Sequence, residues 1–224
     1  MTNGQPIRRA PALKRGGARR RAGQRSMLLT EVQCRNLIGG TEVAWAAGLP
    51  FNRFITLAWE LGGIAPNQCL AATGDFITLA REWLHERGCR MPWAWVQEWG
   101  TKYGAHCHIL LHVPPDLAPL FRVMPRRWAC KVLGGCYVAG VVDSEKLSSA
   151  GAFHALPAAY EAQVMGKVHY MLKCAPAALE APLGMIGRGH RDWGQSCPVY
   201  GKRAGVWQGW RRHLKINPMH AARL

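Results

Sequence analysis

The stretch that decides the fold runs from Gly104 to Pro114 and reads GAHCHILLHVP. The residues after the glycine suit a buried strand, and the proline ends it because proline cannot donate a sheet hydrogen bond. Strand side chains alternate between the two faces of a sheet, so His106 and His108 lie on one face and Cys107 lies on the other. Two imidazoles about 7 Å apart along one face can share a metal ion or a phosphate group.

The residues just before this strand predict a partner for it. Residues 92–99, PWAWVQEW, are rich in aromatic side chains, and residues 100–104, GTKYG, form a short connection flanked by glycines. Folding this hairpin brings Glu98 opposite His106 or His108 on the same sheet face. One carboxylate and two imidazoles suit a divalent ion that keeps open positions for a substrate oxygen. The alternative is a glutamate on the surface of the hairpin; we favour the ligand set.

The composition indicates a globular and strongly basic chain. It has 224 residues, enough for one sizeable domain with extensions, and 49% of them are hydrophobic. The net charge of +16 and the pI near 10.1 favour polyanionic partners, nucleic acid first and anionic membranes second. No apolar run approaches the roughly 18 residues of a membrane span, and the basic start lacks the apolar core of a signal peptide, so we expect a cytoplasmic protein with no membrane partner. The eight cysteines form no Cys-x-x-Cys pair, which argues against a zinc ribbon and for reduced thiols.

The chain divides into three parts. Residues 1–26 are rich in arginine and contain no acidic residue, which predicts a disordered basic tail that contacts phosphates or is simply solvated. Residues 27–174 form the predicted domain, and within it residues 27–49 fit either a short helix or an extended arm. Residues 175–224 are basic and rich in glycine and tryptophan, which predicts a C-terminal extension.

Other elements are predicted on either side of the hairpin. Residues 51–59 are aromatic and β-branched, as is typical of a strand, and residues 136–142 predict another strand. Between the first strand and the hairpin, a helix capped by Thr73 or Asp75 is predicted to end near Gly88. A fifth strand is not identified.

A basic helical segment is predicted from Asp116 to about Leu133, with an interruption at Pro125. Basic side chains recur there at short intervals, at Arg122, Arg126, Arg127 and Lys131. This spacing places positive charge along one face, which can either meet DNA or simply be solvated. The sequence leaves these two interpretations equal.

The helix predicted from Pro157 to about Cys174 carries a tyrosine among lysines. Tyr170 and Lys173 are three residues apart and share one helical face, and Lys167 lies one turn the other way. Beside a phosphate, such a tyrosine can act as an activated nucleophile, because lysine stabilises the phenolate and the charge that develops on the phosphate. A tyrosine in an amphipathic helix more often serves packing, so the catalytic interpretation depends on the histidine strand.

Cations and aromatic rings are interleaved in residues 175–224. This part holds Lys202 and Arg203 among Trp193, Trp207 and Trp210. The pattern suits single-stranded nucleic acid, where bases stack on rings and cations meet phosphates. The alternative is a loop that its tryptophans pack against the domain.

The order of these parts resembles that of the HUH endonucleases, the superfamily of rolling-circle replication initiators, relaxases and single-strand transposases. Residues 54–57 (FITL) resemble the first motif of the replication initiators, residues 106–111 (HCHILL) resemble their His-hydrophobe-His motif, and residues 170–173 (YMLK) resemble their Tyr-x-x-Lys motif. The resemblance covers about residues 51–174. Cys107 stands where a bulkier hydrophobe is more usual, and the chain resembles the one-tyrosine type.

The resemblance implies a fold and a site. The implied fold class is α+β, with a central antiparallel sheet and flanking helices, related to the RNA-recognition or ferredoxin-like arrangement. Glu98, His106 and His108 would hold Mg²⁺ or Mn²⁺, Tyr170 would attack a phosphodiester to leave a 5′-phosphotyrosine, and Lys173 would offset the developing charge. We assign DNA contacts to Arg122, Arg126, Arg127, Lys167, Lys202 and Arg203.

The implied function is that of an endonuclease and strand transferase on single-stranded DNA of an origin or hairpin. It would initiate rolling-circle replication of a plasmid, phage or integrated element in a bacterial cytoplasm, with the host replication helicase and polymerase as partners. A one-tyrosine transposase or a mobilisation relaxase is the nearest alternative, and a non-catalytic protein that binds single-stranded nucleic acid is an alternative of another class. A zinc-binding regulator is disfavoured because alternation places Cys107 on the opposite face from His106 and His108.

Overall fold

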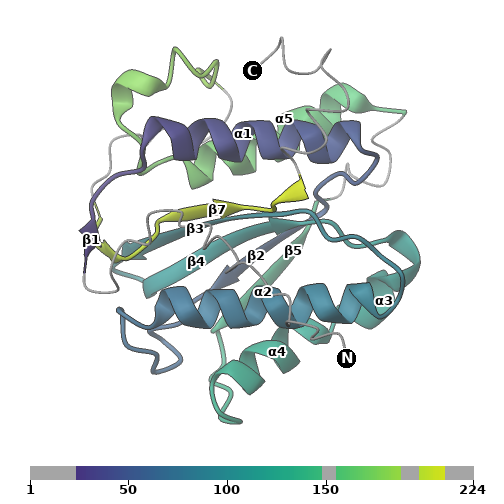
Figure 1. Ribbon diagram of the computed structural model, residues 1–224, viewed down its shortest axis with the longest axis vertical. Helices are drawn as coiled ribbons and strands as arrows, with labels where there is room; N and C mark the ends of the chain where they lie inside the picture. The colour runs from purple at the N-terminus through teal and green to yellow at the C-terminus, as the bar shows by residue number, and fades with distance from the viewer. Residues whose placement is uncertain (1–23, 148–154, 188–196, 210–224) are drawn as a thin grey trace, which may run out of the picture.

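A computed structural model describes residues 24–147, 155–187 and 197–209 and has an α+β fold. A five-stranded antiparallel sheet, in the order β5-β2-β4-β3-β7, lies between two layers of helices (Figure 1). The strands of this sheet are β2 (Arg53–Leu57), β3 (Trp93–Gly100), β4 (Gly104–Leu111), β5 (Val142–Lys146) and β7 (Ala204–Val206). The α-helices are α1 (Glu31–Ala46), α2 (Cys69–His85), α3 (Ala118–Phe121), α4 (Met124–Val132) and α5 (Pro157–Met171). A separate two-stranded ladder pairs β1 (Arg25–Ser26) with β6 (Val199–Tyr200).

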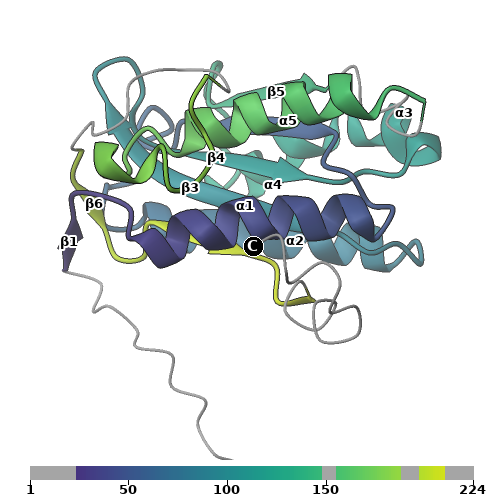
Figure 2. The same ribbon diagram turned by 90° about the horizontal axis from the view of Figure 1, so that it is seen from above.

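The connectivity from β2 to β5 is that of a ferredoxin-like unit. The elements follow one another as strand, helix, two strands, helices and strand, and β2 and β4 occupy the middle of the sheet. Helices α2, α3 and α4 cover one face, while α1 and α5 cover the other (Figures 1 and 2). The predicted fold class is therefore confirmed.

The two sheet faces separate two hydrophobic cores because side chains alternate along each strand. Ile55, Cys107 and Ile109 pack beneath α2 and α4, whereas Phe54 and Leu110 pack against α1 and α5. All five are buried. The even-numbered residues of β3 and β4, which include the predicted ligands, thus face the α1 and α5 layer.

Helix α1 resolves the alternatives left open for residues 27–49. The Thr30 hydroxyl accepts a hydrogen bond from the Gln33 backbone N–H, and the Gln33 side chain accepts one from the Thr30 backbone N–H, so the two residues form a capping box. The inward side of the helix carries buried apolar residues such as Leu37 and Val43. This segment is a helix and not an extended arm.

The predicted caps of the next helix are wrong. Helix α2 begins at Cys69, so Thr73 and Asp75 lie inside it. The buried Thr73 hydroxyl instead accepts a hydrogen bond from the Trp59 indole at 2.9 Å. At the other end, Gly88 has φ +70° just after the helix, as predicted for a glycine that ends a helix.

The strand predicted over 136–142 is also misplaced. Strand β5 begins at Val142, because Gly134, Gly135 and Gly140 have positive φ and hold the preceding residues in turns. Most of β5 is exposed and polar, as an edge strand tolerates. The basic segment after the hairpin divides into α3 and α4, and the break lies just before the predicted interruption at Pro125.

Both segments that were predicted to lie outside the domain, the N-terminal tail and the C-terminal extension, contribute strands to the fold. Residues 1–23 of the predicted basic tail lie outside the described residues, but Arg25 and Ser26 form β1. Residues 175–224 were expected as an extension, yet β7 pairs with β3 and supplies the fifth strand. Among the described residues, no helix is both long and apolar enough to cross a membrane.

Candidate metal site

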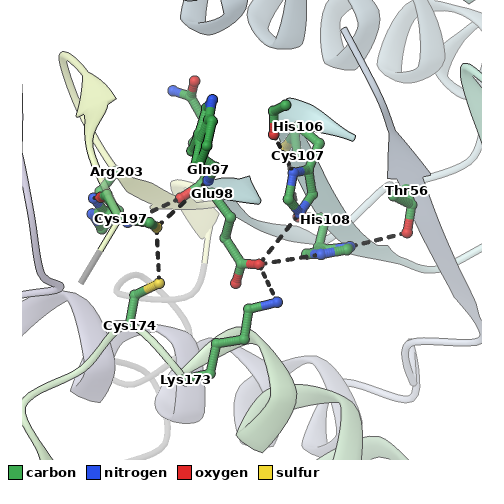
Figure 3. A network of polar contacts seen from close by, with 12 residues as sticks. Thr56, Gln97, Glu98, His106, Cys107, His108, Lys173, Cys174, Cys197 and Arg203 are labelled. Atoms are coloured by element: carbon green, nitrogen blue, oxygen red, sulfur yellow. Dashed lines mark hydrogen bonds and ion pairs between the residues drawn. The ribbon is translucent and has the colours of Figure 1, made fainter. Parts of the chain in front are cut away.

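The β3–β4 hairpin assembles three potential ligands on the sheet face beneath α5. Glu98 pairs with His106 across the hairpin, and His108 follows on the same face (Figure 3). The Glu98 Oε2 atom lies 3.4 Å from His106 Nε2 and 3.4 Å from His108 Nε2. All three side chains are at least 95% buried. The predicted juxtaposition of one carboxylate with two imidazoles is therefore present.

Hydrogen bonds to the far nitrogens orient both imidazoles. His106 Nδ1 donates to the Gly104 carbonyl at 2.8 Å, and His108 Nδ1 lies 3.0 Å from the Thr56 hydroxyl. A carbonyl can only accept, so a neutral His106 carries its proton on Nδ1 and presents the Nε2 lone pair to Glu98. His106 Nε2 and Glu98 Oε2 are then two hydrogen-bond acceptors 3.4 Å apart, and a cation between or beside them would stabilise this arrangement.

The cluster fits a divalent metal ion. One ligand atom from each of Glu98, His106 and His108 lies within 4.8 Å of the others. Glu98 Oε1 and His108 Nε2 are buried and have no hydrogen-bond partner among the described residues, which is costly unless a ligand completes them. The mixed nitrogen and oxygen set suits a borderline-hard ion, and the geometry does not choose among such ions.

Lys173 supplies a positive charge to the same carboxylate. Its Nζ lies 2.5 Å from Glu98 Oε2, from the turn that follows α5. Burial would raise the pKa of Glu98, but contacts with His106 and His108 and the charge of Lys173 hold that pKa well below its usual range. Burial alone would lower the pKa of Lys173, yet Glu98 and Tyr170 together raise it above its usual value.

Burial also keeps His108 neutral. It lowers the pKa of His108, and the neighbouring Glu98 carboxylate offsets this effect only in part. A neutral imidazole is the form that binds a metal ion.

Tyr170 lies directly beside this cluster. Its ring centroid is 5.0 Å from that of His108 and 6.1 Å from that of Phe54, with edge-to-face geometry in both pairs. Lys173 Nζ lies 4.1 Å from the centroid of the same ring. Helix α5 and the turn after it thus bring Tyr170 and Lys173 to the histidine strand, although the helix ends at Met171 and not near Cys174 as predicted. Tyr160 is instead fully buried against Trp45.

The predicted DNA-contacting residues are distributed over several places. Lys167 lies on α5, but it forms an ion pair of 2.6 Å with Glu145 and contacts the Phe54 ring. The exposed Arg126 and Arg127 lie on α4, and the exposed Arg122 lies in the turn between α3 and α4, all on the opposite face of the sheet from the cluster. Their use in DNA binding stays a prediction, and it would need a surface separate from the site.

Lys202 and Arg203 differ from each other. Lys202 is exposed beside the Trp95 ring, whereas Arg203 is fully buried and bonds to protein atoms. In this structure Arg203 is out of reach of a phosphate, because its guanidinium donates to the Ser26 and Cys197 carbonyls. A lone arginine in a glycine-rich segment gave no signal of this structural role.

Thr56 is the site residue that the sequence analysis did not select. It pairs with His108 across β2 and β4, and its hydroxyl lies within hydrogen-bond distance of the imidazole. A polar residue between Ile55 and Leu57 on a buried strand was the available signal.

Comparison with known proteins identifies no relative. No family model, curated protein or solved structure matches the chain. The class of site is therefore defined by its own geometry: a buried glutamate and two histidines, with a tyrosine from helix α5 and a lysine from the turn that follows it.

Proposed function

We propose that this chain is a metal-dependent endonuclease and strand transferase that acts on single-stranded DNA through Tyr170. The observation that supports this most directly is the place of the Tyr170 ring, which contacts His108 on one side and Lys173 on another. A nucleophile of this kind needs a cation nearby and an adjacent group that binds phosphate. Lys173 would supply the cation, and a metal ion held by Glu98, His106 and His108 would bind the phosphate.

The proposed step is a transesterification. The Tyr170 hydroxyl loses its proton, its oxygen forms a bond to phosphorus, and the bond from phosphorus to the 3′ oxygen breaks. The leaving 3′ oxygen takes up a proton, so the products are a 5′-phosphotyrosine and a free 3′-hydroxyl. Because the bond energy is retained, a 3′-hydroxyl can later reverse the step and reseal a strand without ATP.

The residues of the cluster divide the work. Glu98, His106 and His108 would hold Mg²⁺ or Mn²⁺, which would supply Lewis-acid polarisation of the phosphate when bound. Lys173 is placed to stabilise the Tyr170 phenolate and the charge that builds on the phosphate. Lys167 would add positive charge once DNA competes with Glu145 for it.

The net charge of +16 supports a polyanionic substrate. The biological role that fits best is initiation of rolling-circle replication of a plasmid, phage or integrated element in a bacterial cytoplasm, together with the host helicase and polymerase. A one-tyrosine transposase or a relaxase would use the same residues. A non-catalytic protein that binds single strands would need none of them.

The test is formation of a covalent adduct. The protein is incubated with a pool of single-stranded oligonucleotides and Mn²⁺, and a DNA-linked species is sought on a denaturing gel. Tyr170→Phe and added chelator should each abolish the species. Tyr103→Phe is the matched control, because the Tyr103 ring also flanks the cluster, 5.7 Å from the His106 ring, and should leave the adduct intact.

Two results would count against the proposal. Binding of the pool without any adduct, over a broad range of sequences and hairpins, would favour the non-catalytic alternative. An adduct that persists in Tyr170→Phe would assign the nucleophile to another residue.

A further inference from the structure

Two cysteines lie in contact next to the candidate metal site. Cys174 follows Lys173 in the turn after α5, and Cys197 comes from the segment that leads into β6 (Figure 3). Their sulfur atoms are 3.1 Å apart, and both side chains are buried. The two residues come from distant parts of the chain, so the fold itself brings the pair together.

The guanidinium of Arg203 is held against this pair. Arg203 is fully buried, and its NH1 atom lies 3.2 Å from the Cys197 sulfur. Within the described structure it also contacts the Ser26 hydroxyl and the carbonyls of Ser26, Gln97 and Cys197, none of which carries a charge. Among the described residues, no aspartate or glutamate forms an ion pair with it.

A buried cation requires a neighbouring anion. An isolated charge in a protein interior costs several kcal/mol or more, so it is normally paired or neutralised. Arginine stays protonated, which leaves the Cys197 sulfur as the ionisable partner that the guanidinium touches. The Trp99 backbone N–H also points to this sulfur at 3.5 Å, and the Cys174 thiol can donate to it. Three donors converge on one sulfur atom.

These contacts act in opposite directions on the two thiols. The hydrogen bond from the Cys174 thiol lowers the pKa of Cys197, whereas burial raises it. The Trp99 N–H and the Arg203 guanidinium lower it further, so the pKa of Cys197 lies below its usual value. The contact with Cys197, together with burial, raises the pKa of Cys174. These directions agree with the geometry, in which the donors converge on Cys197, and both favour Cys197 as the thiolate and Cys174 as the protonated thiol.

We infer that Cys197, held as a thiolate by Arg203, and Cys174 form a redox site that a small peroxide closes to a disulfide. The inference goes beyond the proposed function, and it does not depend on DNA or on a metal ion. Hydrogen peroxide is small enough to reach a sulfur on a side chain that is 7% exposed. The exposed Cys136 lacks this arrangement of donors in the described structure.

The chemistry balances in two steps. The Cys197 thiolate attacks one peroxide oxygen, the O–O bond breaks, and hydroxide leaves to become water, which gives a sulfenic acid. Cys174 loses its proton and attacks the sulfenic sulfur, the S–O bond breaks, and a second water forms. Two thiols and one peroxide thus yield one disulfide and two waters. The sulfur atoms need to approach by about 1 Å to reach the S–S bond length of about 2.05 Å.

The disulfide would tie two functional parts of the fold together. It would join the turn that carries Lys173 to the segment that leads to β6 and β7. Oxidation by peroxide would then restrain the end of α5 beside the cluster of Glu98, His106 and His108.

Oxidation and peptide mapping test the inference. The folded, reduced protein is treated with chelator and a stoichiometric amount of hydrogen peroxide near pH 7, then alkylated under denaturing conditions and digested with trypsin. We expect residues 174–188 and 192–202 to appear as one cross-linked species lighter by two hydrogen atoms. In Cys174→Ser the reaction should stop at a sulfenic acid on Cys197 that a sulfenic-acid-specific reagent traps. Cys34→Ser, which removes a buried thiol without a cysteine neighbour, should cross-link as the unmodified protein does.

A second measurement tests for the thiolate directly and includes no oxidation step. Thiolates absorb in the far ultraviolet where thiols do not, so near pH 7 the folded protein should show about one thiolate per chain more than Cys197→Ser. The inference is overturned if peroxide oxidises Cys136 or Cys89 first while Cys174 and Cys197 remain open to alkylation. It is also overturned if the absorbance of the protein and of a folded Cys197→Ser are equal. The experiment on the unmodified protein decides the question even if a variant fails to fold.

Discussion

Replacing Lys173 by methionine removes an amino-group charge that contacts the Glu98 carboxylate and leaves the length of the side chain nearly unchanged. The Nζ atom lies 2.5 Å from Glu98 Oε2, and the Lys173 side chain is only 14% exposed. Without it, Glu98 is a buried carboxylate that faces two imidazoles, one of which is kept neutral by burial. We therefore expect the variant to be strongly destabilised when no metal is present.

The size of the loss follows from the burial of the pair. At this distance and an effective dielectric constant of about 20, the attraction is on the order of 7 kcal/mol, most of which offsets the desolvation of both groups. Removing one partner of a buried pair costs about 3–5 kcal/mol, and the slight exposure of Lys173 favours the lower end. For a chain of this size, about 3 kcal/mol lowers the melting temperature by roughly 6–12 °C.

The assay is thermal unfolding with and without Mn²⁺. A divalent ion replaces the missing positive charge and binds the folded state, so it should recover most of the loss in Lys173→Met. Lys167→Met is the matched control, since it removes a lysine of the preceding helix α5 and breaks the more exposed ion pair with Glu145. That pair is worth at most about 1 kcal/mol, and Mn²⁺ should not restore it.

Two results would refute this reasoning. The first is a melting temperature for Lys173→Met that equals that of Lys167→Met in chelator. The second is an equal effect of Mn²⁺ on both variants, which would mean that no ion takes up the position next to Glu98.

Three further predictions concern the rest of the fold. Burial lowers the pKa of His108 and of His112 in the folded protein. Below the unfolded pKa of about 6.5, the unfolded chain therefore binds more protons than the folded one. The metal-free protein should lose stability as the pH falls from about 6.5, and it should melt at a lower temperature at pH 5.5 than at pH 7.5. Gly104→Ala should destabilise by about 1–3 kcal/mol in chemical denaturation, because Gly104 has φ +60° and an added Cβ would lie 2.3 Å from Glu60 Oε2. Arg203→Met should cost about 1–3 kcal/mol by leaving buried carbonyls without a donor, and limited proteolysis should then cut the released N-terminal strand faster.

The centre of the sheet and the ligand set could be predicted because they depend on local pattern. A hairpin with a short connection limits its own register, so the sequence places Glu98 opposite His106 or His108, and the structure pairs it with His106. The register of this hairpin needs no knowledge of distant parts of the chain. The approach of Tyr170 and Lys173 to the histidine strand does not follow from local pattern, and the sequence predicted it only through the resemblance to the HUH endonucleases.

The features that escaped prediction depend on tertiary context. The three-residue strand β7 is too short to show a period, and it is stabilised by pairing with β3 and packing against α1. The apolar residues of 136–142 look like a strand, but the turns at the positive-φ glycines on either side leave residues 136–138 without regular structure. Arg203 resembles any surface cation until the fold surrounds it. The ion pair of Lys167 with Glu145 requires the position of an edge strand that the sequence misplaced.

The pairing of the first described strand with the last part of the chain has a consequence for synthesis on the ribosome. Strand β1 pairs with β6, and Arg203 joins Ser26 across 177 positions of sequence. Neither contact can form until residues 199–203 have left the ribosome. A nascent chain therefore has β2, β3 and β4 available earlier, and the edge of β3 stays unpaired until β7 has also been made. Aggregation through that open edge during translation should depend on how fast the segment between α5 and β7 is made.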